Sequence, residues 1–266
     1  MDMPPPRLDQ ARPLFIIGCV RSGTTLVRDL LRRQPGVICP EETHYFRYGE
    51  PFRTGAHKQP LRNSKTLQKH REIDGIPPDD FESMLAQSRS RGELMCRHVD
   101  YMARARGLEN YKWFDKTPQN VYGLPLIRAE FPKARFLHLV RNPLNVVASL
   151  KLGKVMKVTD IHGACNYWIE AVSIIREMSP SMSDRILEMK YEAFVSDPVA
   201  SMQRLLEFSE LGCDAGLYSE SDARQERNQF RDILSSRERQ TVLRRCGALA
   251  QAYGYSLEDV LRNDPM

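Results

Sequence analysis

The chain carries the stretch LFIIGCVRSGTTLVRDLLRR at residues 14–33 of its 266 residues. Residues 14–17 form a short apolar run that ends at Gly18, which is typical of a buried strand in a parallel sheet. Residues 24–33 place leucines on one helical face, and Pro35 ends that pattern. The stretch therefore predicts a strand, a tight loop and a helix, in that order.

The loop between this strand and helix has the features of an anion site. Backbone N–H groups converge where a glycine-bounded loop meets a helix N-terminus, and the helix dipole favours negative charge there. The spacing of Gly18 and Gly23 is that of a nucleotide P-loop, but Thr24 stands where an NTPase has lysine. We predict that a phosphate-bearing ligand is bound by Arg21, Ser22, Gly23, Thr24 and Thr25.

A second segment indicates that the site works without a metal ion. Residues 135–140 predict another apolar strand, and the residue that follows it is Arg141. A P-loop kinase or NTPase usually has an acidic residue at such a strand end to hold magnesium. No metal ligand is therefore predicted. A P-loop small-molecule kinase using ATP, and a non-catalytic nucleotide-binding protein, are the alternatives to a metal-free group-transfer enzyme.

Strand patterns alternate with helix patterns along the rest of the chain, which predicts an α/β fold with a parallel sheet and helices on both faces. We expect a lead-in at residues 1–12, flexible because it is rich in proline, and a single domain over residues 13–266. A polar, basic excursion at about residues 53–80 resembles a loop or lid. The other expected strands are 111–116 and 185–191, and the other expected helices are 81–106, 123–130, 143–150, 164–178, 197–208 and 235–253.

The composition is that of an ordinary globular chain, with 41% hydrophobic and 27% charged residues. The net charge of +5 suits an anionic ligand but forms no concentrated basic stripe, so nucleic acid is not expected as a partner. Six scattered cysteines without metal-ligand spacing, and no apolar run of membrane length, predict a cytoplasmic protein without a transmembrane segment. The pattern does not indicate an oligomeric state.

Two motifs resemble those of the sulfotransferases that use 3'-phosphoadenosine 5'-phosphosulfate (PAPS). GCVRSGTTL at residues 18–26 is similar to their 5'-phosphosulfate loop, and FLHLVRNPLNVVAS at residues 136–149 to their 3'-phosphate motif. The resemblance implies a P-loop NTPase-like sulfotransferase fold, PAPS as donor and adenosine 3',5'-bisphosphate as product. It implies that Arg141 and Ser149 hold the 3'-phosphate, where a guanidinium can bind with two parallel hydrogen bonds. A later signature around Tyr191 implies a contact with the same phosphate.

The segment Pro40-Glu-Glu-Thr43 resembles the tyrosylprotein sulfotransferases among these families. That resemblance implies in-line displacement with Glu42 as general base and with Lys116 at the departing phosphate. Cations at Arg21 and Lys116 would offset charge there. Those enzymes carry arginine where this chain has His44, so the acceptor hydroxyl stays open among a small molecule, a glycan, a lipid and a peptidyl tyrosine.

Several other polar residues compete for roles in the site. His44 lies close to Glu42 in the sequence and is the rival base. Glu41 is expected to be structural, and His138, inside a predicted strand, is expected to be a core histidine. Three residues are candidates for late contacts with the donor, namely Asn228, Arg231 and Arg237.

Overall fold

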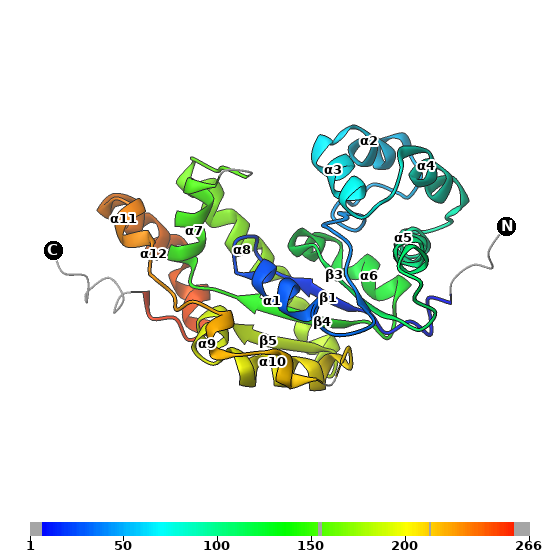
Figure 1. Cartoon of the computed structure of the whole chain (residues 1–266). Helices are drawn as coiled ribbons and strands as arrows, with labels where there is room; N and C mark the ends of the chain where they lie inside the picture. The colour runs from blue at the N-terminus through cyan, green and yellow to red at the C-terminus, as the bar shows by residue number, and fades with distance from the viewer. Residues whose placement is uncertain (1–6, 154–155, 213, 258–266) are drawn as a thin grey trace.

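A computed structural model describes residues 7–153, 156–212 and 214–257. Five parallel strands form one sheet in the order β2-β3-β1-β4-β5 (Figure 1). In the central strand Phe15 lies opposite Asp115 on one side and Phe136 on the other. The strands are β1 (Leu14–Ile17), β2 (Val37–Ile38), β3 (Lys112–Lys116), β4 (Arg135–Val140) and β5 (Ile186–Lys190).

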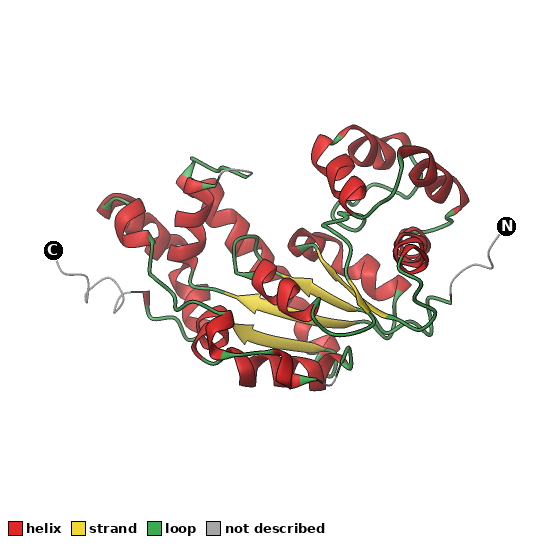
Figure 2. Ribbon diagram, in the orientation of Figure 1, coloured by secondary structure: helices red, strands yellow, loops and turns green. Residues whose placement is uncertain are grey.

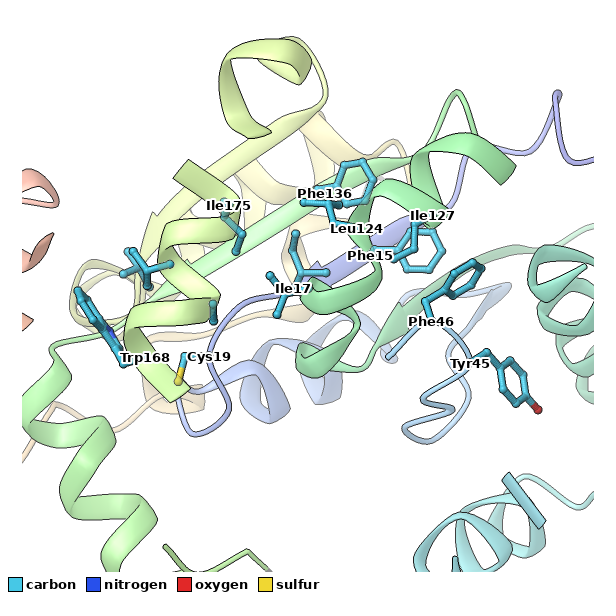
Figure 3. Close-up of a cluster of buried hydrophobic side chains, with 14 of the residues drawn as sticks. Phe15, Ile17, Cys19, Tyr45, Phe46, Leu124, Ile127, Phe136, Trp168 and Ile175 are labelled. Carbon is cyan, nitrogen blue, oxygen red and sulfur yellow. The ribbon is translucent and has the colours of Figure 1, made fainter. Parts of the chain in front are cut away.

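The alternation of side chains in β1 shows why the sheet is covered on both faces. Leu14 and Ile16 enter one hydrophobic core, Phe15 and Ile17 enter the other, and all four are fully buried. Figure 3 shows Phe15 and Ile17 in the second of these cores. Burial on both faces explains why β1 is a continuous apolar run in the sequence. Because a core lies on each face of the parallel sheet, the predicted three-layer α/β fold is confirmed.

Helices line each of these cores (Figure 2). The core of Leu14 and Ile16 is closed by α1 (Thr24–Leu31), α9 (Tyr191–Ser196) and α10 (Pro198–Ser209). The core of Phe15 and Ile17 is closed mainly by α5 (Arg91–Ala105), α6 (Leu124–Glu130), α7 (Pro143–Leu152), α8 (Ile161–Met178), α11 (Phe230–Ile233) and α12 (Ser236–Ala252).

The excursion at residues 53–80 is helical, so the prediction of a loop there is wrong, whereas its role as a lid stays a prediction. It contains α2 (Gly55–Asn63), α3 (Lys65–Ile73) and the start of α4 (Pro78–Gln87), which Figure 1 shows grouped beside the sheet. Side chains of Thr54 and Ser64 cap α2 and α3 by accepting hydrogen bonds from backbone N–H groups. These caps stabilise short polar helices whose apolar periodicity is too weak to predict them.

Further differences concern one helix boundary and several short elements, among them α9 and α11, which were not predicted. The helix expected over residues 81–106 is two helices, because Ser90 leaves the helical conformation and caps α5 by accepting from the Glu93 N–H. The two-residue strand β2 was not predicted. Of the lead-in, residues 1–6 lie outside the described residues, as does the end of the predicted domain at 258–266. Short 3₁₀ helices occur at η1 (Pro118–Gly123), η2 (Ser179–Met182), η3 (Ala215–Leu217) and η4 (Glu220–Asp222).

Candidate functional site

All five strands end at the same edge of the sheet, because all are parallel. Ligands of open α/β sheets bind outside this edge. Each strand end contributes one of the predicted site residues or the segment that carries it. A cavity of about 290 Å³ lies there. It is lined by Val20, Arg21, Gly23, Thr24, Thr25, Glu42, Pro118, Arg141, Ser149 and Met156.

The backbone of the glycine loop adopts conformations that L-residues rarely take. The φ angles are +138° at Gly18, +69° at Arg21 and +93° at Gly23. A Cβ atom at Gly23 would lie 2.2 Å from the ring of Tyr191, so a side chain is excluded there by both φ and contact. The Ser22 hydroxyl is buried and has no hydrogen-bond partner within the described residues. A buried polar group of this kind fits a loop that receives an anion.

The two predicted phosphate motifs contact one another directly. Nε of Arg21 donates to Oγ of Ser149 at 2.9 Å, although 128 residues separate them. The Arg141 guanidinium donates to the backbone carbonyl of Arg21 at 3.0 Å and lies 4.4 Å from the centroid of the Tyr191 ring. Arg21, Arg141, Ser149 and Tyr191 therefore surround one space beside the N-terminus of α1.

The turn that presents Arg141 is held from three sides. The indole of Trp168 on α8 donates to the carbonyl of Arg141 at 2.9 Å. The N–H of Asn142 donates to Glu192 at 2.9 Å, and the hydroxyl of Tyr255 donates to the same carboxylate at 2.7 Å. These hydrogen bonds fix the backbone at residues 141–142, and this backbone places the side chain of Arg141 at the cavity.

Sequence reasoning missed Glu226, which contacts the central cation of this site. Nε of Arg141 donates to Oε2 of Glu226 at 2.7 Å, and a second guanidinium nitrogen lies 2.5 Å from the same oxygen. The side chains are only 12% and 10% exposed. Of the three late candidates, Asn228 lies nearby and accepts a hydrogen bond from Asn145 on α7. Glu226 belongs to no recognisable motif, and only the folded chain brings it to Arg141.

Opposite this group, Glu42 lies between a lysine and a histidine. Nζ of Lys116, at the end of β3, pairs with Oε1 of Glu42. Nε2 of His44 lies 3.5 Å from the other carboxylate oxygen. Burial opposes ionisation of Glu42, but the hydrogen bonds and charges of His44 and Lys116 outweigh it and lower the pKa of Glu42 to about 2. Burial lowers the pKa of His44 despite its neighbouring carboxylate.

Asp115 positions the segment that carries Glu42. Its carboxylate accepts from the Thr117 N–H and hydroxyl, from Asn120 and, at 3.3 Å, from the Thr43 hydroxyl. The N–H of Thr43 also donates to the Thr117 hydroxyl at 3.1 Å. Burial raises the pKa of Asp115 to about 6, against the hydrogen bonds that favour its charged form. This buried network fastens residues 42–44 to the end of β3.

Neighbouring ionisable residues have partners outside the cavity. Glu41 pairs with Arg28 at 2.8 Å and with Arg32 at 2.9 Å, as expected of a structural residue. His138 is fully buried in β4 and contacts Glu188 at 2.9 Å. Within the described ranges, no three His, Cys, Asp or Glu residues are grouped so that they could hold a metal ion. No helix there is long and apolar enough to span a membrane.

Comparison with known proteins agrees with this architecture. A model of the "Sulfotransferase family" matches residues 13–215. Protein-tyrosine sulfotransferase A of Caenorhabditis elegans is 27% identical over 206 residues, which cover 76% of this chain and 50% of that protein. Nodulation protein NoeE of Sinorhizobium fredii is 29% identical over 138 residues, covering 52% of this chain and 30% of that protein. The chain thus spans half or less of the length of these relatives.

Two solved structures share the fold. The sulfotransferase domain of the Synechococcus PCC 7002 olefin synthase has a TM-score of 0.59 at 24% identity, with 82% of each chain covered. The sulfotransferase domain from the curacin biosynthetic pathway has a TM-score of 0.58 at 17% identity, with 82% of this chain and 81% of that chain covered. Because the family model matches well over half of the chain, including all five strands and every residue that lines the cavity, the chain belongs to the sulfotransferase family.

Proposed function

We propose that the chain transfers a sulfuryl group from PAPS to a hydroxyl group of an acceptor. The observation that carries this proposal is the direct contact of the two phosphate motifs, through Arg21 with Ser149 and through Arg141 with the Arg21 carbonyl. They face the cavity that Glu42 also lines. Two anion-binding groups beside one ionised carboxylate suit a doubly phosphorylated donor and a hydroxyl acceptor.

On this proposal the donor is held at both of its ends. The N-terminus of α1, with the Ser22 hydroxyl and the Thr24 and Thr25 side chains, holds the 5'-phosphosulfate. Arg141 and Ser149 hold the 3'-phosphate, and the Tyr191 ring packs beside it. The buried Ser22 hydroxyl, which has no partner among the residues that the structure describes, and the side-chain-free position at Gly23 support this fit, because a phosphate can approach the backbone closely there.

The proposed transfer step can be written with the acceptor, the donor and residues of this chain alone. The acceptor oxygen attacks sulfur in line, its proton passes to the Glu42 carboxylate, and the bond from sulfur to the bridging phosphate oxygen breaks. The departing group is adenosine 3',5'-bisphosphate. Lys116 and Arg21 offset the charge that forms on its 5'-phosphate. Lys116 pairs with Glu42 in this structure, and on the proposal the departing phosphate competes with Glu42 for it.

The low pKa of Glu42 has a consequence for its role as a base. A carboxylate with a pKa of about 2 is fully ionised at neutral pH but accepts a proton poorly. We infer that Lys116 turns toward the departing phosphate as charge develops, which raises the proton affinity of Glu42 during transfer. His44 keeps the second carboxylate oxygen oriented while this happens. In this way the base becomes stronger in the step that needs it.

Transfer from labelled donor is the experiment that tests this function. The protein is incubated with PAPS labelled at sulfur and with a panel of phenols, sugars, lipids and tyrosine peptides. We expect label on a hydroxyl compound, one adenosine 3',5'-bisphosphate released per transfer, and no need for magnesium. Phosphoryl transfer from ATP with magnesium, without sulfuryl transfer, would instead support the kinase alternative.

A further inference from the structure

Glu226 pairs with the guanidinium of Arg141, the group that would hold the 3'-phosphate on the proposed function. The guanidinium directs Nε and a second nitrogen at one carboxylate oxygen, as it would at one oxygen of a phosphate. Both side chains are nearly buried, so solvent screens this pair less than an exposed one. A phosphate and a carboxylate cannot share these two donors, because their like charges repel.

The loop that carries Glu226 is shaped around this carboxylate. Oε1 of Glu226 accepts the N–H of Arg227 at 2.9 Å and the N–H of Asn228 at 3.3 Å. Asn228 has a φ of +51°, and its side chain accepts from Asn145 at 3.1 Å. The two carboxylate oxygens therefore join Arg141 to the loop backbone. Removing Glu226 from Arg141 requires either a new side-chain rotamer or movement of residues 224–228.

We propose that Glu226 is a built-in competitor of the donor, and that its carboxylate occupies the anion subsite on Arg141 until a phosphate displaces it. The identity of the phosphate as the 3'-phosphate of the donor rests on the proposed function. The anion subsite on Arg141 does not, because it follows from the contacts of Glu226. Displacement frees Glu226 and its loop only when a ligand brings its own anion to Arg141. The contact thus weakens the binding of ligands that place a phosphate on Arg141 and leaves the binding of ligands without such a phosphate unchanged.

The size of the effect follows from the population of the competent state. If about a tenth of the molecules have Arg141 free, the apparent dissociation constant is raised about tenfold over its intrinsic value. Glu226→Gln keeps the size of the side chain and removes its charge. We therefore expect about tenfold tighter binding of adenosine 3',5'-bisphosphate to the variant. Adenosine 5'-monophosphate, which lacks the 3'-phosphate, should bind wild type and variant equally.

The experiment measures both nucleotides by calorimetry against wild type, Glu226→Gln, Glu226→Asp and Glu220→Gln. Glu220 is an exposed residue of the same C-terminal region, so its variant removes one negative charge away from the cavity. Glu220→Gln should bind as wild type does, and Glu226→Asp should lie nearer to wild type than to Glu226→Gln. Unchanged or weaker bisphosphate binding by Glu226→Gln would overturn the inference, since Glu226 would then merely hold Arg141 in place.

Inorganic phosphate separates this inference from the proposed function. Phosphate should raise the melting temperature of Glu226→Gln more than that of wild type, and adding Arg141→Gln should abolish the difference. If this pattern appears while neither protein binds the bisphosphate, the competitor role of Glu226 stands and the proposed donor fails. If the bisphosphate binds all variants equally and phosphate shows no difference, the donor stands and the competitor role fails.

Discussion

The two sides of the cavity are built in different ways. On the proposed function, the donor side consists of short motifs that directly follow strands, namely residues 18–25, Arg141 and Ser149 with the neighbouring Tyr191. The base side on the same proposal is Glu42 with its partners His44 and Lys116, which the fold brings together; Glu42 and Lys116 are 74 positions apart. The donor side therefore owes its geometry to local strand–loop–helix structure. The base side depends on the buried network of Asp115.

The largest effect is expected on the base side. Glu42→Gln removes the proton acceptor but keeps its size, so turnover should fall by about 10²–10⁴. Binding of adenosine 3',5'-bisphosphate should be nearly unchanged, because on the proposed function Glu42 contacts the acceptor and not this product. Steady-state rates with labelled donor and calorimetry on the same preparation measure the two quantities. The control is Glu207→Gln, which removes a carboxylate at an exposed position on α10. Full turnover by Glu42→Gln would show that Glu42 is not the base and would assign that role to His44.

On the donor side, Gly23→Ala should disturb the loop itself. The new Cβ meets the Tyr191 ring and the residue keeps a left-handed φ, so the free energy of unfolding should fall by about 1–3 kcal/mol. Gly49→Ala is the matched control, because no atom of the described part of the chain lies within 4 Å of a Cβ there. Urea unfolding measures both. Adding Tyr191→Ala should recover part of the loss, and strict additivity would show that the predicted contact is absent.

A milder change on the donor side is Arg141→Lys, which keeps the charge and loses the planar fork. We expect adenosine 3',5'-bisphosphate to bind about tenfold more weakly, with adenosine 5'-monophosphate little affected. Calorimetry with both nucleotides compares this variant with Arg204→Lys, a change on the exposed surface of α10. Equal weakening of both nucleotides would indicate that Arg141 does not read the 3'-phosphate.

A separate effect is a dependence of stability on pH from Glu42. Its pKa is lowered from 4.5 to about 2 in the folded chain, so its contribution to stability is present above about pH 4.5 and is lost as the pH falls toward 2. The difference in unfolding free energy between wild type and Glu42→Gln should therefore shrink between pH 4.5 and 3. Urea unfolding at three pH values measures it. A difference that stays constant would mean that the Lys116 and His44 contacts do not hold in solution.

The same contrast explains what the sequence could predict. Residues 14–25 and residues 135–149 are each one continuous stretch of sequence. In each stretch the apolar periodicity and the turn residues predict a strand, a loop and a helix. Glu42 was found through its resemblance to a family motif, but its contacts with Lys116 and His44 required the fold. The carboxylate of Glu226 was missed because it lies 85 positions from Arg141 in an irregular loop. The helices at 55–73 were missed because each buries a single leucine, Leu61 or Leu67, among polar residues, which leaves little apolar periodicity in the sequence.

The central claim, that this cavity binds a doubly phosphorylated sulfuryl donor without a metal, is tested most directly by thermal unfolding with nucleotides. Adenosine 3',5'-bisphosphate in the absence of magnesium should raise the melting temperature of the wild-type protein, because it binds only the folded state. Adenosine 5'-monophosphate at the same concentration should raise it less. Stabilisation by ATP with magnesium, together with no response to the bisphosphate, would contradict the account.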